Sequence, residues 1–531
     1  MKDFTALYQA IDRTNKTTEK VAAMEAYFAA ASSADAAWAV YFLGGQKLQR
    51  LVNTTRLRQW ACEAAALPAW LLEESYEWVG DLGETLAAVV PDSGLSAAGG
   101  LAEWVEGRLL PLRAMEEADQ RAAVLAAWSE LDQPQRLVFN KLITGSFRVG
   151  VSQALMVRAV SAVSGVSVEA VAHRLMGRWT PSAEFYEQVV SPETFAASLF
   201  QPYPFCLAYQ IDGEASQLGE AADYVAEWKW DGIRAQLIRR GGKFFAWSRG
   251  EERLEERFPE LAMAAAAVPD GTVLDGEILA WGDGVPRPFA DLQRRIGRKS
   301  VGKKLLAEVP VAFVAFDLLE FAGEDLRTQP LADRRAELER VIAAADSPAL
   351  QISRRVESDA WQTLAEARAA CREMGAEGLM LKRFDSPYAV GRVRGVWWKW
   401  KIEPYTVDAV MTAAQRGHGR RASMYTDYTF SLWEEGELVS FAKAYSGLTD
   451  EELRRVDAFV RQNTLERFGP VRTVKPVLVM EIAFENLQVS KRHKSGVAVR
   501  FPRILRWRHD KTPPQADTLE TLKRLAAGQG R

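Results

Sequence analysis

The chain has 531 residues, of which 48% are hydrophobic and 26% charged, close to ordinary globular values. At roughly 150 residues per domain, this length predicts three or four domains. No run of about 18 apolar residues occurs, so no transmembrane helix is expected, and residues 1–20 lack the apolar region of a signal peptide. The three cysteines lie far apart and form no CxxC pair, which argues against a zinc site or a disulfide framework. A cytoplasmic protein is expected, and the net charge of −3 argues weakly against nucleic-acid binding.

The first 200 residues are rich in alanine, leucine, glutamate and tryptophan, and their apolar residues recur at helical spacing. This pattern predicts an all-α segment. Helices are expected at 20–31, 60–79 and 121–131, and loops at 90–100 and 132–135.

Near the end of this segment, glycines interrupt a helical pattern and a new helix is expected to start at about Ser152. The interruption places Arg148 and Ser152 beside a helix N-terminus. Backbone N–H groups and an arginine at such a position can hold a phosphate. Taken alone, these residues favour an ordinary joint between two helices over a phosphate site.

The pattern changes at residue 201, after which short strand-like runs dominate and helical stretches intervene. Strands are expected at 224–228, 234–239, 244–248, 273–280, 309–316 and 397–402, and helices at 254–268, 331–344 and 359–374. An α+β domain over residues 201–403 follows from this alternation.

A β-rich segment follows Pro404. Strands are expected at 407–413, 425–433, 438–444 and 477–484, with a helix at 449–468. A small β-barrel over residues 404–515 fits this order. Residues 516–531 are expected to form a C-terminal tail with a short exposed helix.

The central chemical signal is the octapeptide from Glu227 to Arg234, in which a strand runs through Lys229 into an Asp-Gly turn. A lysine at a strand end can point into a cleft. It attacks phosphorus only as the neutral amine, which burial and nearby cations favour. Arg234 is a candidate for such a cation and for a phosphate clamp. Alone, the pattern also fits an exposed lysine in a hairpin turn.

The octapeptide resembles the first motif of the covalent nucleotidyltransferases, the superfamily of ATP-dependent DNA ligases, RNA ligases and mRNA-capping enzymes. The other motifs of that superfamily follow in order over about 280 residues. They resemble residues 248–250, 274–277, 313–319, 377–382, 397–401 and 500–511. The resemblance implies a fold with an α+β nucleotidyltransferase domain, ATP-grasp-like, and a C-terminal β-barrel of the OB-fold type.

The resemblance also implies roles for individual residues. Lys229 would attack the α-phosphate of ATP and expel pyrophosphate, and Phe316 would stack on adenine. Glu377 and Glu277 would hold Mg²⁺, an ion that prefers oxygen ligands. Further nucleotide contacts are expected from Glu227 at the adenine edge, from Glu277 at the ribose, and from Arg234, Arg249, Arg394, Lys399 and Lys401.

Lys399 and Lys401 alternate with tryptophans on an expected strand. Because side chains alternate with period 2, both lysines are expected on one face and the tryptophans on the other. The lysine face would offer two cations to a phosphate. Arg394 is expected to join them, and Arg392 competes for that place.

Two basic stretches are candidate phosphate-binding segments. One covers residues 287–304 and includes Arg294, Arg295 and Arg298. The other covers residues 491–511 and includes Arg503, Arg508 and Lys511. In the superfamily, the second stretch orients the departing pyrophosphate before the barrel domain rotates on a hinge near residues 403–406. A solvated helix face is the plain alternative for the first stretch.

The segment from Leu142 to Ser152 resembles part of the DNA-binding domain of cellular ATP-dependent DNA ligases, so residues 1–200 are expected to be a helical DNA-binding domain. We therefore expect a monomeric enzyme that uses ATP and Mg²⁺ to seal nicks in double-stranded DNA through lysyl-AMP and DNA-adenylate, with no membrane partner. An RNA ligase, an mRNA-capping enzyme and a non-catalytic nucleic-acid scaffold are the alternatives. NAD-dependent ligases are disfavoured because the zinc-ligand cysteines are missing.

Overall fold

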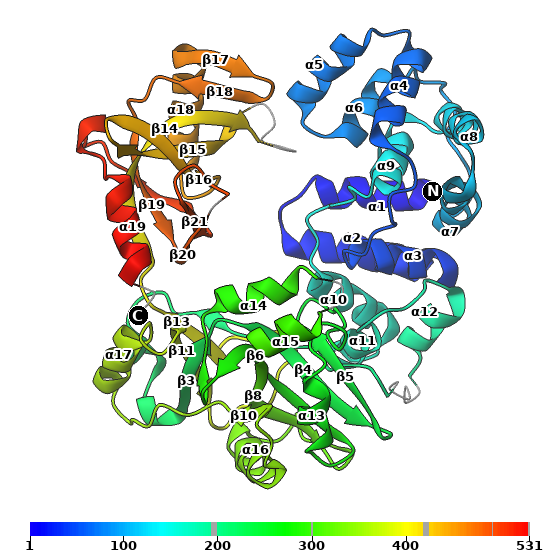
Figure 1. Ribbon diagram of the computed structural model, residues 1–531. Helices are drawn as coiled ribbons and strands as arrows, with labels where there is room; N and C mark the ends of the chain where they lie inside the picture. Colours follow the sequence, from blue (N-terminus) through cyan, green and yellow to red (C-terminus); the bar gives the residue numbers. More distant parts are fainter. Residues whose placement is uncertain (193–198, 299–300, 418–423, 491, 529–531) are drawn as a thin grey trace. The chain divides into compact units, whose positions relative to one another are not determined.

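The computed structural model describes residues 1–192, 199–298, 301–417, 424–490 and 492–528 (Figure 1). The chain divides into two compact units. The first contains residues 1–23, 34–152 and 403–531, and the second contains residues 24–33 and 153–402. The domain boundaries expected at 200, 403 and 515 stay predictions. In the described chain no single helix is long and apolar enough to cross a membrane; one bent pair, α10 (Gln153–Ser164) with α11 (Val168–Arg174), meets that criterion only in combination.

The N-terminal residues form short helices. They are α1 (Lys2–Asp12), α2 (Thr17–Ala30), α3 (Ser33–Leu43), α4 (Thr54–Ala65), α5 (Ala69–Val79), α6 (Leu82–Val89), α7 (Leu101–Trp104), α8 (Glu117–Glu130) and α9 (Gln133–Thr144). The single helix expected at 60–79 is wrong, because Ala66 adopts a left-handed conformation after α4 and Pro68 precedes α5. The loop expected at 132–135 is also largely helix, since Asp132 and Gln135 form a capping box at the start of α9.

The C-terminal part of the first unit is an antiparallel sheet in the order β16–β15–β14–β18–β17, with β19 joining β14 to β22. Its strands are β14 (Tyr405–Arg416), β15 (Tyr425–Glu434), β16 (Glu437–Ala444), β17 (Thr464–Phe468), β18 (Val471–Val474), β19 (Val479–Phe484) and β22 (Arg503–Trp507), beside a hairpin of β20 (Asn486–Val489) and β21 (Val497–Arg500). The backbone N–H of Ile504 donates to Ser446 O at 2.9 Å, which brings β22 next to the end of β16.

Two helices of this region differ from expectation. α18 (Asp450–Asn463) ends five residues early, because the chain from Thr464 pairs with β18 as strand β17. α19 (Leu519–Gly528) is not simply exposed, since Leu519 and Leu522 are fully buried in the core of the sheet. Its apolar stripe therefore closes that core.

Among the described residues, the second unit carries a seven-stranded sheet and a four-stranded sheet beside a two-stranded parallel pair. The larger has the order β10–β8–β6–β4–β5, and the smaller has the order β2–β13–β11–β3. The strands are β2 (Tyr209–Gln210), β3 (Tyr224–Trp230), β4 (Ile233–Arg240), β5 (Lys243–Ser248), β6 (Thr272–Gly282), β8 (Val311–Phe321), β10 (Leu350–Ile352), β11 (Ala376–Arg383) and β13 (Trp397–Lys401), with a separate parallel pair of β1 (Cys206–Leu207) and β12 (Gly391–Arg392).

The helices of this unit are α10 (Gln153–Ser164), α11 (Val168–Arg174), α12 (Ala183–Val190), α13 (Leu261–Ala266), α14 (Phe289–Ile296), α15 (Lys303–Glu308), α16 (Leu331–Ala345) and α17 (Trp361–Ala370). The helix expected at 254–268 shrinks to α13, because Leu254 first returns to pair with Ala246 of β5. One apolar cluster contains Trp247 of the larger sheet and Trp397 of the smaller one. The candidate site lies along this junction of the two sheets.

Candidate active site

Lys229 lies near the end of β3, and its Nζ donates to Glu377 Oε2 at 2.5 Å. Lys401 of β13 places its Nζ 3.7 Å from the same carboxylate oxygen. All three side chains are only partly exposed. One carboxylate thus holds two lysines from the strands on either side of β11.

A bulge in β11 turns Glu377 toward these lysines. Regular alternation would place Glu377 on the face of Leu379 and Leu381, which pack in the apolar cluster behind the sheet. The pairing of β11 with β3 shifts register between Ala376 and Leu379, and Gly378 has φ +139°. Such a bulge re-aims a side chain. Sequence alternation alone could not reveal this orientation.

Glu277 lies on β6, opposite Arg234 of β4 in the strand register. Burial raises the pKa of the Glu277 carboxyl to about 8, although the positive charges of Lys229 and Arg234 oppose that shift. Burial thus favours the neutral form of this carboxyl more than water does. An added cation beside it would favour the carboxylate form.

Lys399 lies on β13, two residues before Lys401. Burial lowers the pKa of Lys399, and the charges of Lys401, Lys229, Arg392 and Arg249 lower it further. These four cations therefore lie near enough to Lys399 to act on its charge. A cluster of like charges with one carboxylate is suited to bind a polyanion such as a triphosphate.

Arg394 lies elsewhere. It lines an open groove with Tyr224 and Trp398, side chains that belong to the apolar cluster behind the smaller sheet. Arg392, the competing residue, lies over the ring of Tyr209, 5.6 Å from its centroid, and the nucleotide contact predicted for Arg394 stays a prediction.

The predicted segregation of the tryptophans holds for two of the three. Trp398 and Trp400 pack behind the sheet, opposite the lysines. Trp397 was expected with them and instead packs between the sheets, where its ring lies edge-on to Phe316 at 5.9 Å. Because Trp397 has the same strand parity as Lys399, period 2 already required this placement.

Arg234 is not an open cation as predicted. Its Nε and Nη2 donate to the two oxygens of the buried Asp275, at 3.1 and 2.7 Å, and its Nη1 donates to Cys206 O at 2.7 Å. The guanidinium also lies over Phe316, 5.4 Å from the ring centroid. Arg234 therefore supports the aromatic wall, with its charge paired by Asp275.

The residues predicted to contact the base are Phe316 of β8, which is half-buried, and Glu227 of β3, which is buried. Glu227 accepts hydrogen bonds from Lys382 Nζ at 2.6 Å and from Arg335 Nη1. Lys382 and Arg335 were not among the predicted site residues. Lys382 could have been found from the sequence, because strand alternation in β11 places it on the same face as the site lysines. Arg335 could not, because it lies 108 residues from Glu227.

The loop around residue 150, where a phosphate site was predicted, is a tethered loop, anchored to other helices on both sides of Arg148. Phe147 stacks on Phe4 with ring centroids 5.6 Å apart, and Lys20 Nζ donates to Gly150 O at 2.8 Å. Arg148 is exposed between these anchors, and Ser152 directly precedes α10.

The basic residues in and just after α14 separate into two groups. Arg294 and Arg298 are exposed, although Arg294 forms an ion pair with Glu308. Arg295 is fully buried and donates through Nη1 and Nη2 to Glu260, at 2.6 and 2.8 Å. The predicted DNA contact by Arg295 is therefore wrong, because its charge is used inside the fold. Lys299, in the same stretch, lies outside the described residues.

Asp408 of β14 neutralises part of the last basic stretch. Both of its oxygens accept from Arg508 Nη1, at 2.9 and 2.7 Å, and Oδ2 also accepts from Lys511 Nζ at 2.5 Å. Arg503 pairs with Glu485 at 2.9 Å. The three predicted DNA contacts are thus ion-paired in this structure. Lys491 lies outside the described residues.

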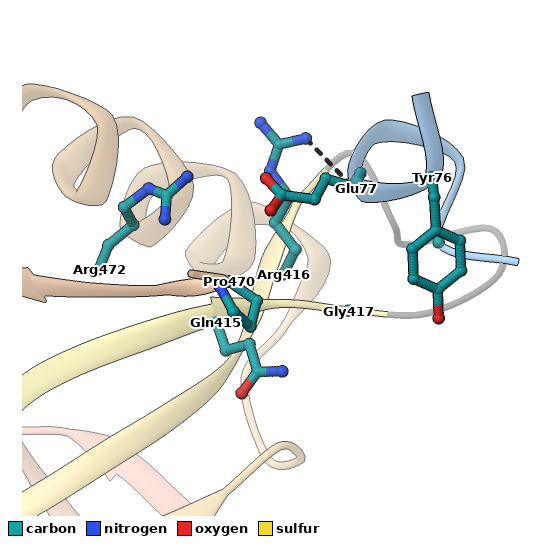
Figure 2. A pocket seen from close by; sticks show the side chains of 8 residues that line it. Tyr76, Glu77, Gln415, Arg416, Gly417, Pro470 and Arg472 are labelled. Carbon is teal, nitrogen blue, oxygen red and sulfur yellow. Dashed lines mark hydrogen bonds between the residues drawn. The ribbon is translucent and has the colours of Figure 1, made fainter. Parts of the chain in front are cut away.

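A separate pocket of the first unit contains none of the predicted site residues. Tyr76 and Glu77 of α5 line it together with Gln415 and Arg416 of β14 (Figure 2). Arg416 Nη1 donates to Glu77 O at 3.3 Å. The pocket has no chemistry-bearing cluster comparable to that around Lys229.

Residues 1–161 match the family described as DNA ligase N terminus, residues 206–401 match the ATP dependent DNA ligase domain, and residues 421–511 match the ATP dependent DNA ligase C terminal region.

Relatives extend the match. A protein named Probable DNA ligase from Koribacter versatilis is 33% identical, over 98% of this chain and 96% of that protein. A Probable DNA ligase from Opitutus terrae is 32% identical, over 99% of this chain and 62% of that protein. A solved structure described as Pmar-Lig_PreS3, 17% identical, shares the fold over 95% of this chain and 99% of that chain with a TM-score of 0.61. The chain therefore belongs to the ATP-dependent DNA ligases, enzymes that join DNA through a lysyl-AMP intermediate.

Proposed function

We propose that Lys229 is the amine that accepts AMP in this ligase, and that the face bearing Lys399 and Lys401 receives the phosphates. The observation that carries the proposal is the Glu377 carboxylate shared by Lys229 and Lys401. It places the candidate nucleophile within a cluster of cations at the junction of two sheets. Phe316 and Glu227, beside this cluster, provide a wall and a polar edge for adenine.

In the first step, Lys229 Nζ forms a bond to the α-phosphorus while the bond to the bridging oxygen breaks and pyrophosphate leaves. The amine must lose a proton, and Glu377 at 2.5 Å is the base within hydrogen-bond reach. Lys399 and Lys401 stabilise the negative charge on the phosphate oxygens. The 5′-phosphate of a nick then takes AMP from Lys229, and the 3′-hydroxyl displaces AMP to form the phosphodiester.

Glu277 and Glu377 are the residues proposed to hold Mg²⁺. The described residues contain no cluster of three or more acidic, histidine or cysteine side chains able to enclose a metal. Two carboxylates still fit Mg²⁺, which commonly binds one or two carboxylates together with water and substrate phosphates. The ion, when bound, would draw charge from the phosphate oxygens.

We further propose that the N-terminal helices bind nicked duplex DNA and that the C-terminal sheet is an OB-fold barrel. The exposed Arg148 supports the first assignment, because such a cation contacts phosphates without reading sequence. Arg294 and Arg298, which lie in the second unit, are proposed to add phosphate contacts there. The bond from Ile504 to Ser446 supports the second assignment, since it joins the sheet's two margins. A cytoplasmic, monomeric enzyme is part of the same proposal.

Labelling with ATP that carries ³²P at the α-phosphate tests the nucleophile. We expect label on the denatured wild-type protein and none on Lys229→Ala or Lys229→Arg. Lys243→Ala serves as the control, because Lys243 begins β5 in an exposed position. Label retained by Lys229→Ala would overturn the assignment. Loss of label accompanied by a changed unfolding midpoint would point to misfolding, so urea unfolding is measured on the same samples.

A further inference from the structure

The carboxylate of Glu227 is fixed by two buried cations from different elements. Lys382 of β11 donates to Oε2 at 2.6 Å, and Arg335 of α16 donates to Oε1. Arg335 Nη2 also donates to Ser353 O at 2.6 Å, so its guanidinium is held at both ends. All three charged side chains are at least nine-tenths buried.

This arrangement determines how the carboxylate can be used. An ionised carboxylate offers about four lone-pair positions, and the two cations occupy one on each oxygen. The remaining positions keep a fixed direction, because rotation would break a charged hydrogen bond in a buried environment. Glu227 therefore presents acceptors only, in one orientation.

Lys382 also connects the carboxylate to the aromatic wall. Its Nζ lies 4.1 Å from the ring centroid of Phe316 and 4.5 Å from that of Trp397. These are cation–π distances. The ammonium that holds the carboxylate therefore lies against the aromatic wall on which the proposed base would stack.

We propose that Lys382 and Arg335 are positioning residues that set base selection. They orient Glu227 so that it accepts a hydrogen bond from the 6-amino group of adenine. The carbonyl oxygen at position 6 of guanine meets the same carboxylate acceptor to acceptor and is repelled. This inference rests on the proposed function, in which Phe316 stacks on the base transferred to Lys229.

The test compares protein labelling by three α-labelled nucleotides: ATP, GTP and purine riboside triphosphate, which lacks the 6-amino group. For the wild type we expect kcat/KM to be about 10- to 100-fold higher for ATP than for the purine analogue, the range for one hydrogen bond to a charged group. Lys382→Met and Arg335→Met should reduce that ratio to within about 3-fold, mainly by raising KM for ATP.

Arg334 provides the matched control. It precedes Arg335 on α16, is fully buried, and pairs with Asp317 rather than Glu227. Arg334→Met should destabilise the fold while leaving the nucleotide ratio at the wild-type value. If the methionine variants do not fold, Arg335→Lys tests the proposal instead. Lysine keeps the charge but cannot bond to Glu227 and to Ser353 O together as the guanidinium does, so the ratio of ATP to the purine analogue should fall about 3-fold.

The proposal is overturned if Lys382→Met and Arg335→Met fold and keep the wild-type ratio of ATP to the purine analogue, or if Arg335→Lys keeps it. It is also overturned by a wild-type enzyme that labels equally well with ATP and the purine analogue, or by an Arg334→Met variant that loses the ratio as fully as Lys382→Met. These results are separate from the nucleophile. Label retained by Lys229→Ala refutes the lysyl-AMP assignment whatever the nucleotide ratios are. If Lys229→Ala is unlabelled but Lys382→Met and Arg335→Met keep the wild-type ratio of ATP to the purine analogue, only the base-selection role of Lys382 and Arg335 is refuted.

Discussion

Gly378 is the residue whose replacement should damage the active site most specifically. It sits in the β11 bulge with φ +139° and lies opposite Lys401 in the β13 register. A Cβ added there would lie 2.2 Å from Trp400 O and 2.8 Å from Lys401 Cα. Both are backbone atoms, so no side-chain rotation relieves the clash.

The cost of Gly378→Ala follows from these distances. Strand β13 would have to retreat from β11 by about 1 Å to reach an ordinary contact, and a misplacement of about 1 Å can lower an enzymatic rate about 100-fold. The backbone conformation itself costs about 1–3 kcal/mol for a residue with a side chain. We therefore expect protein adenylation to slow about 100-fold and the free energy of unfolding to fall by about 2 kcal/mol or more.

Gly375→Ala separates the two effects. Gly375 also has a positive φ, +69°, but no atom lies within 4 Å of an added Cβ. Its replacement should cost about 1 kcal/mol and leave the adenylation rate near wild type. The assay is the initial rate of labelling from α-labelled ATP, with urea unfolding of the same samples. Wild-type labelling by Gly378→Ala, or equal slowing by Gly375→Ala, would refute the bulge geometry as the cause.

Three further predictions test other parts of the fold. Arg298→Ala should weaken binding to nicked duplex and lower the slope of log affinity against log salt by about 1. Arg295→Ala should chiefly destabilise the protein, by about 3–5 kcal/mol, because it breaks a buried ion pair. Equal unfolding midpoints for the two variants would contradict this. Burial lowers the pKa of His173 to about 4, so its neutral form contributes stability that is fully present above pH 6.5 and is lost as the pH falls toward 4. Between pH 7 and 4.5 the free energy of unfolding of the wild type should fall by about 2 kcal/mol more than that of His173→Phe. Parallel curves of unfolding free energy against pH would refute this prediction. Asp408→Asn should free Lys511, whereas Arg508 keeps its pair with Asp510, and should steepen the salt dependence of DNA binding by about 1. An unchanged slope would show that this lysine does not meet phosphate.

The sequence predicted the strands of the site better than the directions of its side chains. Lys399 and Lys401 face the same side because strand alternation is a local rule. Glu377 escapes that rule, since its direction depends on a bulge that forms only when β11 pairs with β3. The motif identified the residue, but tertiary pairing determined its orientation.

Arg295 shows a different limit. Its position three residues after the buried Leu292 already placed it on the inner face of α14, so helical spacing could have separated it from Arg294. Its partner Glu260 lies 35 residues away, and no local pattern predicts that pair. Counting basic residues along a stretch therefore overestimated the cations available to DNA.

The tethered loop around Arg148 has a thermodynamic consequence. Its neighbours Phe147 and Val149 are buried, and Lys20 holds Gly150, so the backbone on both sides of the arginine is already ordered. Fixing a flexible residue costs about 1–2 kcal/mol, and a pre-organised loop avoids that loss when it meets a phosphate. Phosphates are alike at every base pair. Rigidity here would therefore raise affinity for a duplex equally at all sequences, as suits an enzyme whose substrate is defined by a break and not by a base.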